Sequence, residues 1–220
     1  MNDFVNNMGR DICVTSDGKH VVTGSSQKTI RIFRIEDKKL VREINEHTES
    51  IWSVYVTLDC KYVVTGSEGK TIRITRIEYG MLVREIKGRH IGHVSNVCVT
   101  PDGKHVVSAC YTYTDIDYEN ENPMVFIHIT RIKDGMLVRE IRVDGDDDVE
   151  RLCVTPGGKH LVYNTYRTIV VQGFRRNYIM YNYTYNTLYN DFCVTPDGKQ
   201  VVAYDEPRII VMNFVHLYAT

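Results

Sequence analysis

The chain has 220 residues, of which 43% are hydrophobic, and its formal net charge at pH 7 is −1. This length suffices to bury a core in one all-β domain or in two small domains. The near-zero charge excludes a general basic surface for nucleic acid, and no apolar run reaches the length of a membrane span. Residues 1–10 lack the apolar core of a signal peptide, so we expect a soluble cytoplasmic protein.

The first predicted elements are the strands Asp11–Thr15 and His20–Gly24, joined by a Ser-Asp-Gly turn. β-Branched residues favour strands, aspartate bonds back to the backbone of a turn, and glycine accepts positive φ. Two further strands follow at Thr29–Ile35 and Leu40–Ile44. No stretch of useful length has a helical period, so the sequence predicts an all-β fold.

This hairpin recurs at residues 97–107, 152–162 and 192–202, and in weaker form at 54–64, where Cys60 replaces the turn glycine. The anchoring valines of successive copies are 42, 43, 55 and 40 residues apart, which suits a four-stranded propeller blade. The predicted outer strands of the second and third copies are Thr71–Ile77, Leu82–Ile86, Phe126–Ile132 and Leu137–Ile141. The repeats cover residues 11–44, 51–86, 95–141, 150–181 and 190–214.

Short motifs stand at matching places in these repeats. They are Gly92-His93, Thr-Pro-Asp-Gly at 100–103, Thr-Gly-Ser at 23–25 and 65–67, and Thr-Ile-Arg-Ile at 29–32 and 71–74. Their combination resembles the WD-repeat family of β-propellers over nearly the whole chain. The resemblance implies a single domain over residues 1–220, a five-bladed β-propeller of four-stranded antiparallel blades.

The repeats depart from the family pattern in their polar residues. The Trp-Asp pair is absent, with Phe33-Arg34 and Thr75-Arg76 in its place in the first two repeats. The loop histidine is present as His47 and His93. We therefore expect that no blade forms the family's His–Ser–Asp–Trp network, and that the blades cohere by apolar packing.

The fifth repeat ends at its third strand, Arg208–Phe214. The family closes its ring with an N-terminal strand, which implies that Asn2–Val5 takes the fourth-strand place of the last blade. Closure removes free sheet edges, so we expect a monomer. The alternative is an open ring that a second copy of the chain completes, as a homo-oligomer.

Cysteines occupy one equivalent position in four repeats, as Cys13, Cys98, Cys153 and Cys193. Without any Cys-x-x-Cys pair they do not suggest a metal site, and we expect reduced, buried thiols. The sequence also lacks a phosphate-binding loop and the known hydrolase and zinc-protease motifs. It predicts no enzyme, no metal and no cofactor. His47, His90 and His93 are expected to cap loops, and the repeated Arg-Glu pairs of the outer strands to be solvated.

Two acidic segments mark a candidate binding face. The third repeat carries extra residues at 111–123, and the connection after it, 143–150, is also acidic. The resemblance places both on the face with the connections between second and third strands and between repeats, which we call the loop face. Tyrosine-rich residues 182–188 fall there as well. The acidic loop lacks EF-hand spacing, which disfavours calcium, and a merely flexible acidic loop is the other alternative.

Carboxylates and tyrosines together suit a basic segment, which they attract by charge and by cation–π contacts. The predicted partner-binding residues are Tyr111, Tyr113, Asp115, Asp117, Tyr118, Glu119, Glu121, Asp144, Asp146, Asp147, Asp148, Tyr183 and Tyr185. The sequence thus predicts a non-catalytic scaffold for a partner protein or basic peptide, with neither nucleic acid nor membrane as partner. Two alternatives stay open: a structural, self-assembling propeller, designed or fragmentary, and a ligand-binding or enzymatic propeller that uses its central channel.

Overall fold

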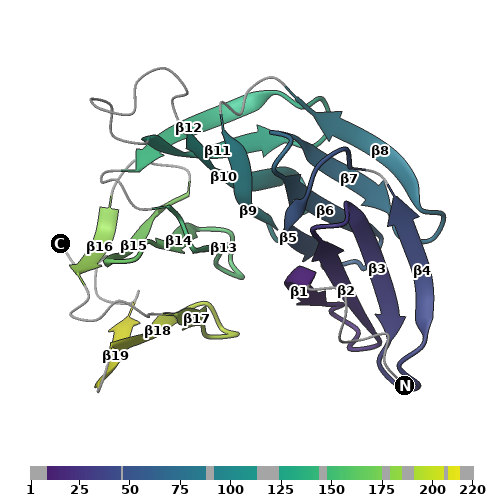
Figure 1. Ribbon diagram of the computed structural model, residues 1–220. Helices are drawn as coiled ribbons and strands as arrows, with labels where there is room; N and C mark the ends of the chain where they lie inside the picture. The colour runs from purple at the N-terminus through teal and green to yellow at the C-terminus, as the bar shows by residue number, and fades with distance from the viewer. Residues whose placement is uncertain are drawn as a thin grey trace. The chain divides into compact units, whose positions relative to one another are not determined.

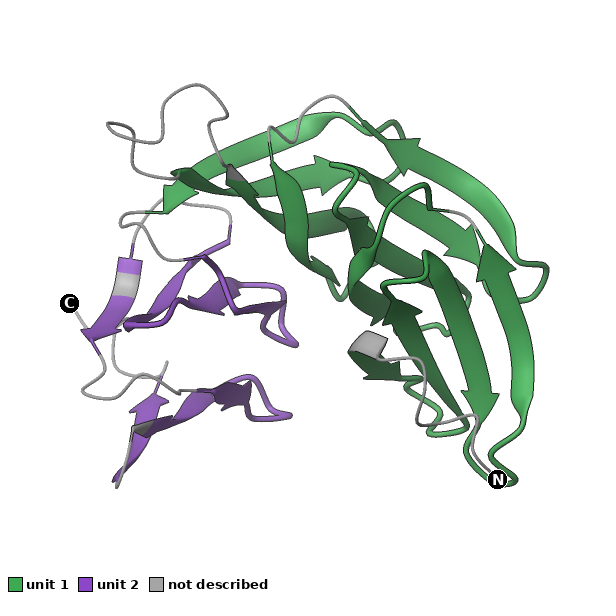
Figure 2. Cartoon of the chain, viewed as in Figure 1, with its two compact units in different colours: residues 1–146 green, residues 147–220 purple. Residues whose placement is uncertain are grey.

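The protein is described here from a computed structural model, which defines residues 9–45, 47–87, 92–112, 124–143, 148–174, 179–184, 191–205 and 208–213. Within these ranges the chain forms strands and turns without a helix (Figure 1). The strands make five antiparallel sheets, each a meander in which consecutive strands are neighbours. The chain divides into two compact units, residues 1–146 (unit 1) and 147–220 (unit 2) (Figure 2).

Unit 1 contains three four-stranded sheets. The first consists of β1 (Gly9–Val14), β2 (His20–Ser25), β3 (Thr29–Arg34) and β4 (Leu40–Asn45). The second consists of β5 (Ile51–Val56), β6 (Tyr62–Ser67), β7 (Ile72–Arg76) and β8 (Met81–Ile86). The third consists of β9 (His93–Val99), β10 (His105–Thr112), β11 (Met124–Arg131) and β12 (Leu137–Val143).

Unit 2 contains two sheets. The first consists of β13 (Arg151–Val154), β14 (His160–Asn164), β15 (Thr168–Gly173) and β16 (Ile179–Thr184). The second consists of β17 (Phe192–Val194), β18 (Gln200–Asp205) and β19 (Arg208–Asn213), three strands among the residues described. The predicted all-β fold of four-stranded antiparallel sheets is confirmed. The predicted closing strand, residues 2–5, lies outside the described residues.

In the first, second, third and last sheets, the turn between the first two strands is built by a Thr-x-Asp pattern. In the first sheet, Thr15 Oγ1 donates to Asp17 Oδ1 (2.6 Å), and the same carboxylate oxygen accepts from the Lys19 amide (3.0 Å). The turn ends with a residue at positive φ, which is Gly18 in the first sheet and Cys60 in the second. The repeated Asp therefore holds a turn, as the sequence predicts.

Apolar packing joins the sheets of each unit. One cluster of isoleucine and valine side chains lies between the first and second sheets, and another between the second and third. In unit 2 an equivalent cluster contains Phe192 and Met212. The close approach of the sheets depends on Gly24 and Gly66, since a Cβ on Gly66 would lie 2.7 Å from Val94 Cγ1. Apolar cohesion is thus confirmed within the units.

Cohesion is not only apolar, which corrects the expectation from the sequence. Asp11 Oδ2 on β1 accepts from Ser53 Oγ (3.0 Å) and from the Val54 amide (2.7 Å) on β5. Ser53 Oγ in turn accepts from the Val97 amide on β9 (3.1 Å). This relay links three sheets through side chains that the family pattern does not mark, at a cost in desolvation that the hydrogen bonds offset.

The outer arginines also differ from the expected solvated pairs. Arg42 on β4 donates to the Glu78 carbonyl in the second sheet (2.9 Å), and Arg84 on β8 donates to the Lys133 carbonyl in the third (2.8 Å). The neighbouring glutamates pair across strands instead, as in Arg73–Glu85 (2.7 Å). The arginines of the first two Arg-Glu repeats, Arg42 and Arg84, therefore tie one sheet to the next.

All six cysteines are free thiols in the structure, including the four at the equivalent repeat position. Cys98 is buried and Cys13 and Cys153 are half-buried, whereas Cys193 is exposed. The expectation of four buried thiols is therefore wrong for Cys193. Burial raises the pKa of the Cys153 thiol to about 12, so this thiol is held in its unreactive protonated form.

Candidate functional site

On the loop face of unit 1, three aromatic rings meet where β5 and β9 begin and β10 ends. Trp52 lies 4.7 Å from His93 between ring centroids, and His93 lies 5.7 Å from Tyr111. Tyr111 is brought there by its register, since it is paired with His93 across β9 and β10. All three side chains are half-buried. We call Trp52, His93 and Tyr111 the aromatic corner; it stands at the root of the acidic insertion.

A buried histidine on the same face of unit 1 contacts a threonine hydroxyl. His47 is buried, and its Nε2 lies 2.7 Å from Thr65 Oγ1. Burial, and secondarily the positive charge of Arg73, lower the pKa of His47 to about 4, against a smaller opposing effect of Glu85. His47 is therefore neutral at pH 7 and caps its loop, which agrees with its predicted role.

Three of the thirteen predicted partner-binding residues are described by the structure. Tyr111 belongs to the aromatic corner. Asp148, in unit 2, accepts a hydrogen bond from the Val149 amide through Oδ1 (2.7 Å). Tyr183 corrects the predicted loop 182–188, because it lies in β16, paired with Ile169, and packs against the apolar cluster of unit 2. The others lie outside the described residues: Tyr113, Asp115, Asp117, Tyr118, Glu119, Glu121, Asp144, Asp146, Asp147 and Tyr185.

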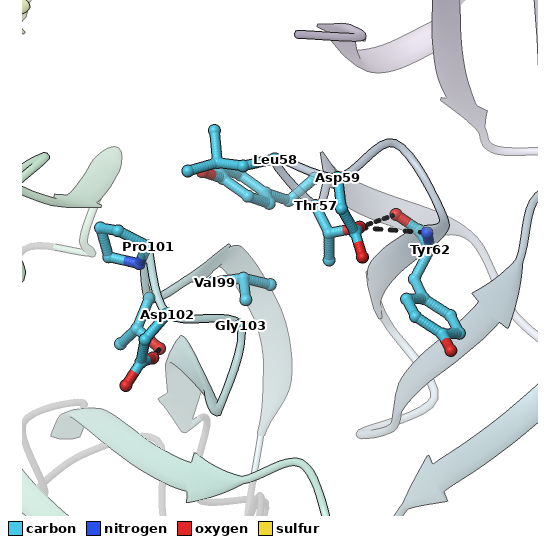
Figure 3. A pocket seen from close by; sticks show the side chains of 10 residues that line it. Thr57, Leu58, Asp59, Tyr62, Val99, Pro101, Asp102 and Gly103 are labelled. Atoms are coloured by element: carbon cyan, nitrogen blue, oxygen red, sulfur yellow. Dashed lines mark hydrogen bonds between the residues drawn. The ribbon is translucent and has the colours of Figure 1, made fainter.

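A pocket of about 370 Å³ lies on the opposite side of unit 1, between the β5–β6 turn and the β9–β10 turn (Figure 3). Its lining includes Tyr55, Leu58, Tyr62, Val99 and Pro101, together with the two turn aspartates. None of these residues belongs to the partner-binding site predicted from the sequence. The signal in the sequence is that Tyr55, Leu58 and Tyr62 differ from the equivalent residues of the other repeats. Among the described residues no group of three His, Cys, Asp or Glu side chains is arranged to hold a metal ion.

Three segments of the chain, residues 8–34, 38–75 and 83–114, match the sequence profile of the WD40 family, described as "WD domain, G-beta repeat". Residues 8–114 therefore carry WD40 repeats. The matched segments all lie in unit 1, and they confirm the resemblance found in the short motifs. No helix among the described residues is long and apolar enough to cross a membrane.

Two solved structures share the fold of this chain. The β-propeller domain of Cps50 (Swd1) from Myceliophteria thermophila is 16% identical, with a TM-score of 0.72 over 98% of this chain and 69% of that one. Hydrazine synthase from Kuenenia stuttgartiensis is 18% identical, with a TM-score of 0.71 over 89% of this chain and 55% of that one. These identities indicate a shared fold only. No protein with a curated description matches the chain.

The WD40 repeats retain only part of the family's polar network. His47 and Thr65 make its histidine–hydroxyl contact in the second sheet, although the sequence predicts that no sheet forms the full network. His93, the second retained loop histidine, contacts Trp52 and Tyr111 instead. A residue that caps a loop in one WD40 repeat thus contributes to an aromatic surface in the next.

Proposed function

We propose that this protein is a non-catalytic WD40 interaction module that binds a basic segment of a partner protein on its loop face. The observation that carries the proposal is the aromatic corner at the root of the acidic insertion. Half-buried aromatic rings offer contact area at low entropic cost and flat faces for lysine or arginine side chains. WD40 propellers commonly serve protein–protein interaction, which is the general class of this proposal.

Charge adds selectivity to that surface. The insertion places Asp115, Asp117, Glu119 and Glu121 directly after the corner's Tyr111 in the chain, with no basic residue between them. A cluster of carboxylates repels itself, and a basic partner relieves that repulsion. Association with such a partner is accelerated by the attraction of opposite charges, and added salt slows it.

The test uses the single tryptophan as a reporter. A peptide of alternating arginine and glycine is titrated into the protein while the fluorescence of Trp52 is followed. We expect saturable binding that weakens as salt is added. The Glu119→Gln/Glu121→Gln variant should bind about tenfold more weakly, equivalent to roughly 1.4 kcal/mol.

The matched control is the Glu36→Gln/Glu78→Gln variant, which removes two charges on the opposite side of unit 1. Asp17 and Asp102 are unsuitable for this purpose because their carboxylates hold turns. The control should bind like the native protein. Equal weakening in both variants, or binding that ignores salt, contradicts the assignment to the loop face.

We also propose that the sheets form a five-bladed ring. In this ring β1 packs on the exposed apolar face of the last sheet, and residues 2–5 form the fourth strand of that sheet. Two apolar faces support this. Ile12 on β1 is 65% exposed, whereas its equivalent Val54 is buried. Ile209 on β19 is 70% exposed, whereas its equivalent Ile30 is buried. Exposed apolar faces of this kind are typical of surfaces that a neighbour covers.

Side-chain size supports the same pairing. In unit 1, Gly24 faces Ile51 and Gly66 faces Val94. Among the five residues at the position of Gly24 in the repeats, Tyr204 of the last sheet is the largest. Among the five at the position of Ile51, Gly9 on β1 is the smallest. In unit 1 the second strand of one sheet supplies the small residue and the first strand of the next sheet supplies the large one. At the proposed closure this order is reversed, so the total volume of the facing pair stays similar.

A double-mutant cycle tests ring closure. Gly9→Val should lower the melting temperature by several degrees in the native background and by much less in a Tyr204→Ala background. Deletion of residues 1–6 should destabilise the protein or cause association through the freed edge. Additive effects of the two substitutions contradict closure by β1. A mass that rises with concentration indicates a ring shared between copies instead.

A cytoplasmic location belongs to this proposal as well. Its support is the presence of six free cysteines, which persist as thiols in a reducing compartment.

A further inference from the structure

The second repeat departs from its sister repeats at three residues that line one pocket. Tyr55 stands where the other four repeats carry cysteine, and Leu58 where they carry serine or proline. Tyr62 stands where they carry histidine or glutamine. All three line the pocket of about 370 Å³ between the β5–β6 and β9–β10 turns (Figure 3). The sister repeats fold without these three side chains, so the fold does not require them. Their convergence on one cavity therefore indicates a function of the cavity.

The pocket has an apolar interior and an anionic rim. Buried Val99 lies among its lining residues, while the Leu58 side chain is 57% exposed on one turn and Pro101 occupies the other. Both turn aspartates, Asp59 and Asp102, are exposed. The volume lies at the lower end of the range for ligand pockets, which suits one or two side chains rather than a large cofactor.

Both rim carboxylates are ionised at neutral pH. Partial burial raises the pKa of Asp59, but hydrogen bonds from the Thr57 hydroxyl and the Lys61 amide, with the Lys61 charge, bring it below its usual value. For Asp102, the hydrogen bond from the Thr100 hydroxyl is the largest cause of a lowered pKa. One oxygen of each carboxylate is used by its own turn. The Lys61 ammonium is 3.9 Å from Asp59 Oδ2 and well exposed, so this pair is weak.

The turn that carries Leu58 is held in place from the neighbouring sheet. Ser16 Oγ donates to the Leu58 carbonyl (2.7 Å) and contacts Cys60 Sγ (3.1 Å). Cys60 adopts a φ of 56° at the place where the sister turns use glycine. A non-glycine residue in this region costs free energy, and anchored strain of this kind is typical of functional positions.

We propose that this pocket binds a short extended peptide of a partner protein, with a bulky apolar side chain inserted between Leu58 and Pro101 and a flanking lysine or arginine at Asp59 and Asp102. The site lies on the opposite side of unit 1 from the aromatic corner and is independent of the function proposed above. It gives the module a second, separate contact, so that two segments of one partner, or two partners, bind together.

The test compares three capped peptides, each labelled with a fluorophore and followed by anisotropy. The first has the sequence Ser-Lys-Phe-Arg-Ser, the second has alanine in place of phenylalanine, and the third has glutamate in place of both cations. We expect the first peptide to bind at least tenfold more tightly than either of the others. The Leu58→Pro/Tyr62→His variant carries residues of the sister repeats, so it keeps the turn, and it should lose this preference.

Two control variants separate this site from the loop face and from general effects. Gln200→His makes the equivalent exchange in unit 2 and should leave binding unchanged. Glu119→Gln/Glu121→Gln should also leave the preference for phenylalanine unchanged, whatever it does to the arginine–glycine peptide. The proposal is overturned if the native protein does not distinguish the three peptides, or if the preference survives in Leu58→Pro/Tyr62→His. It is also overturned if the preference is lost in either control.

Discussion

The Gly66→Ala variant should be less stable than the native protein by about 1–3 kcal/mol, the usual cost of overpacking a well-packed interior. Alanine adds a Cβ that would lie 2.7 Å from Val94 Cγ1, 3.0 Å from Val97 Cγ1 and 3.1 Å from the Val94 carbonyl oxygen. Two of these atoms belong to a packed core and the third to the backbone of β9, so none is a flexible side-chain end. Denaturant unfolding followed by Trp52 fluorescence measures the effect in unit 1.

The control for this prediction is Gly69→Ala, in the turn that joins β6 and β7 of the same sheet. Its added Cβ would lie 3.5 Å from Glu49, an ordinary van der Waals distance, and the residue does not have positive φ. Its stability should change by less than about 0.5 kcal/mol. A Gly66→Ala variant as stable as Gly69→Ala would show that the second and third sheets do not approach as closely as described.

The stability of unit 1 should fall as the pH is lowered from about 6.5 to about 4. In the folded state the pKa of His47 is about 4, whereas in the unfolded chain it returns to its ordinary value near 6.5. Unfolding therefore takes up a proton in this range, and the free energy of unfolding decreases with falling pH. The full difference corresponds to about 3 kcal/mol. The aspartates of the turns add their own loss only at lower pH, because their folded pKa values lie below the ordinary value near 3.8.

The variant His47→Gln isolates this effect. It should be somewhat less stable than the native protein at pH 7, because the contact with Thr65 is altered, but its stability should change much less between pH 7 and pH 4. The measurement is urea unfolding at several pH values with Trp52 as the probe. Parallel pH profiles for the native and variant proteins would mean that His47 is not the titrating group.

The strands and turns could be predicted from the sequence because local chemistry determines them. β-Branched alternation locates β3 and β7 to within a residue or two, and the Thr-x-Asp pattern marks turns whose hydrogen bonds are entirely local. The apolar clusters follow from the same alternation, since one face of each strand must be buried.

Contacts between repeats could not be predicted in this way. The relay from Asp11 through Ser53 to the Val97 amide joins residues more than 40 positions apart, and neither Asp11 nor Ser53 belongs to a recognised motif. Alignment with the family repeat assigns Tyr183 to the connection after the fourth repeat. The alternation of tyrosine with polar residues there is also the period of a strand, and the ring packs on the core. The sequence shows that Tyr55, Leu58 and Tyr62 differ from their equivalents in the other repeats, but only the structure shows that they line one pocket.

Hydrogen exchange tests most directly whether the loop face is the surface that binds a basic partner. Amide exchange of the native protein is measured with and without a saturating amount of the arginine–glycine peptide. We predict slower exchange at residues 111–123 and 143–150, and unchanged exchange at residues 57–62 and 99–103. Protection confined to the latter two segments, or binding of the peptide without protection of the acidic segments, would contradict the proposed function.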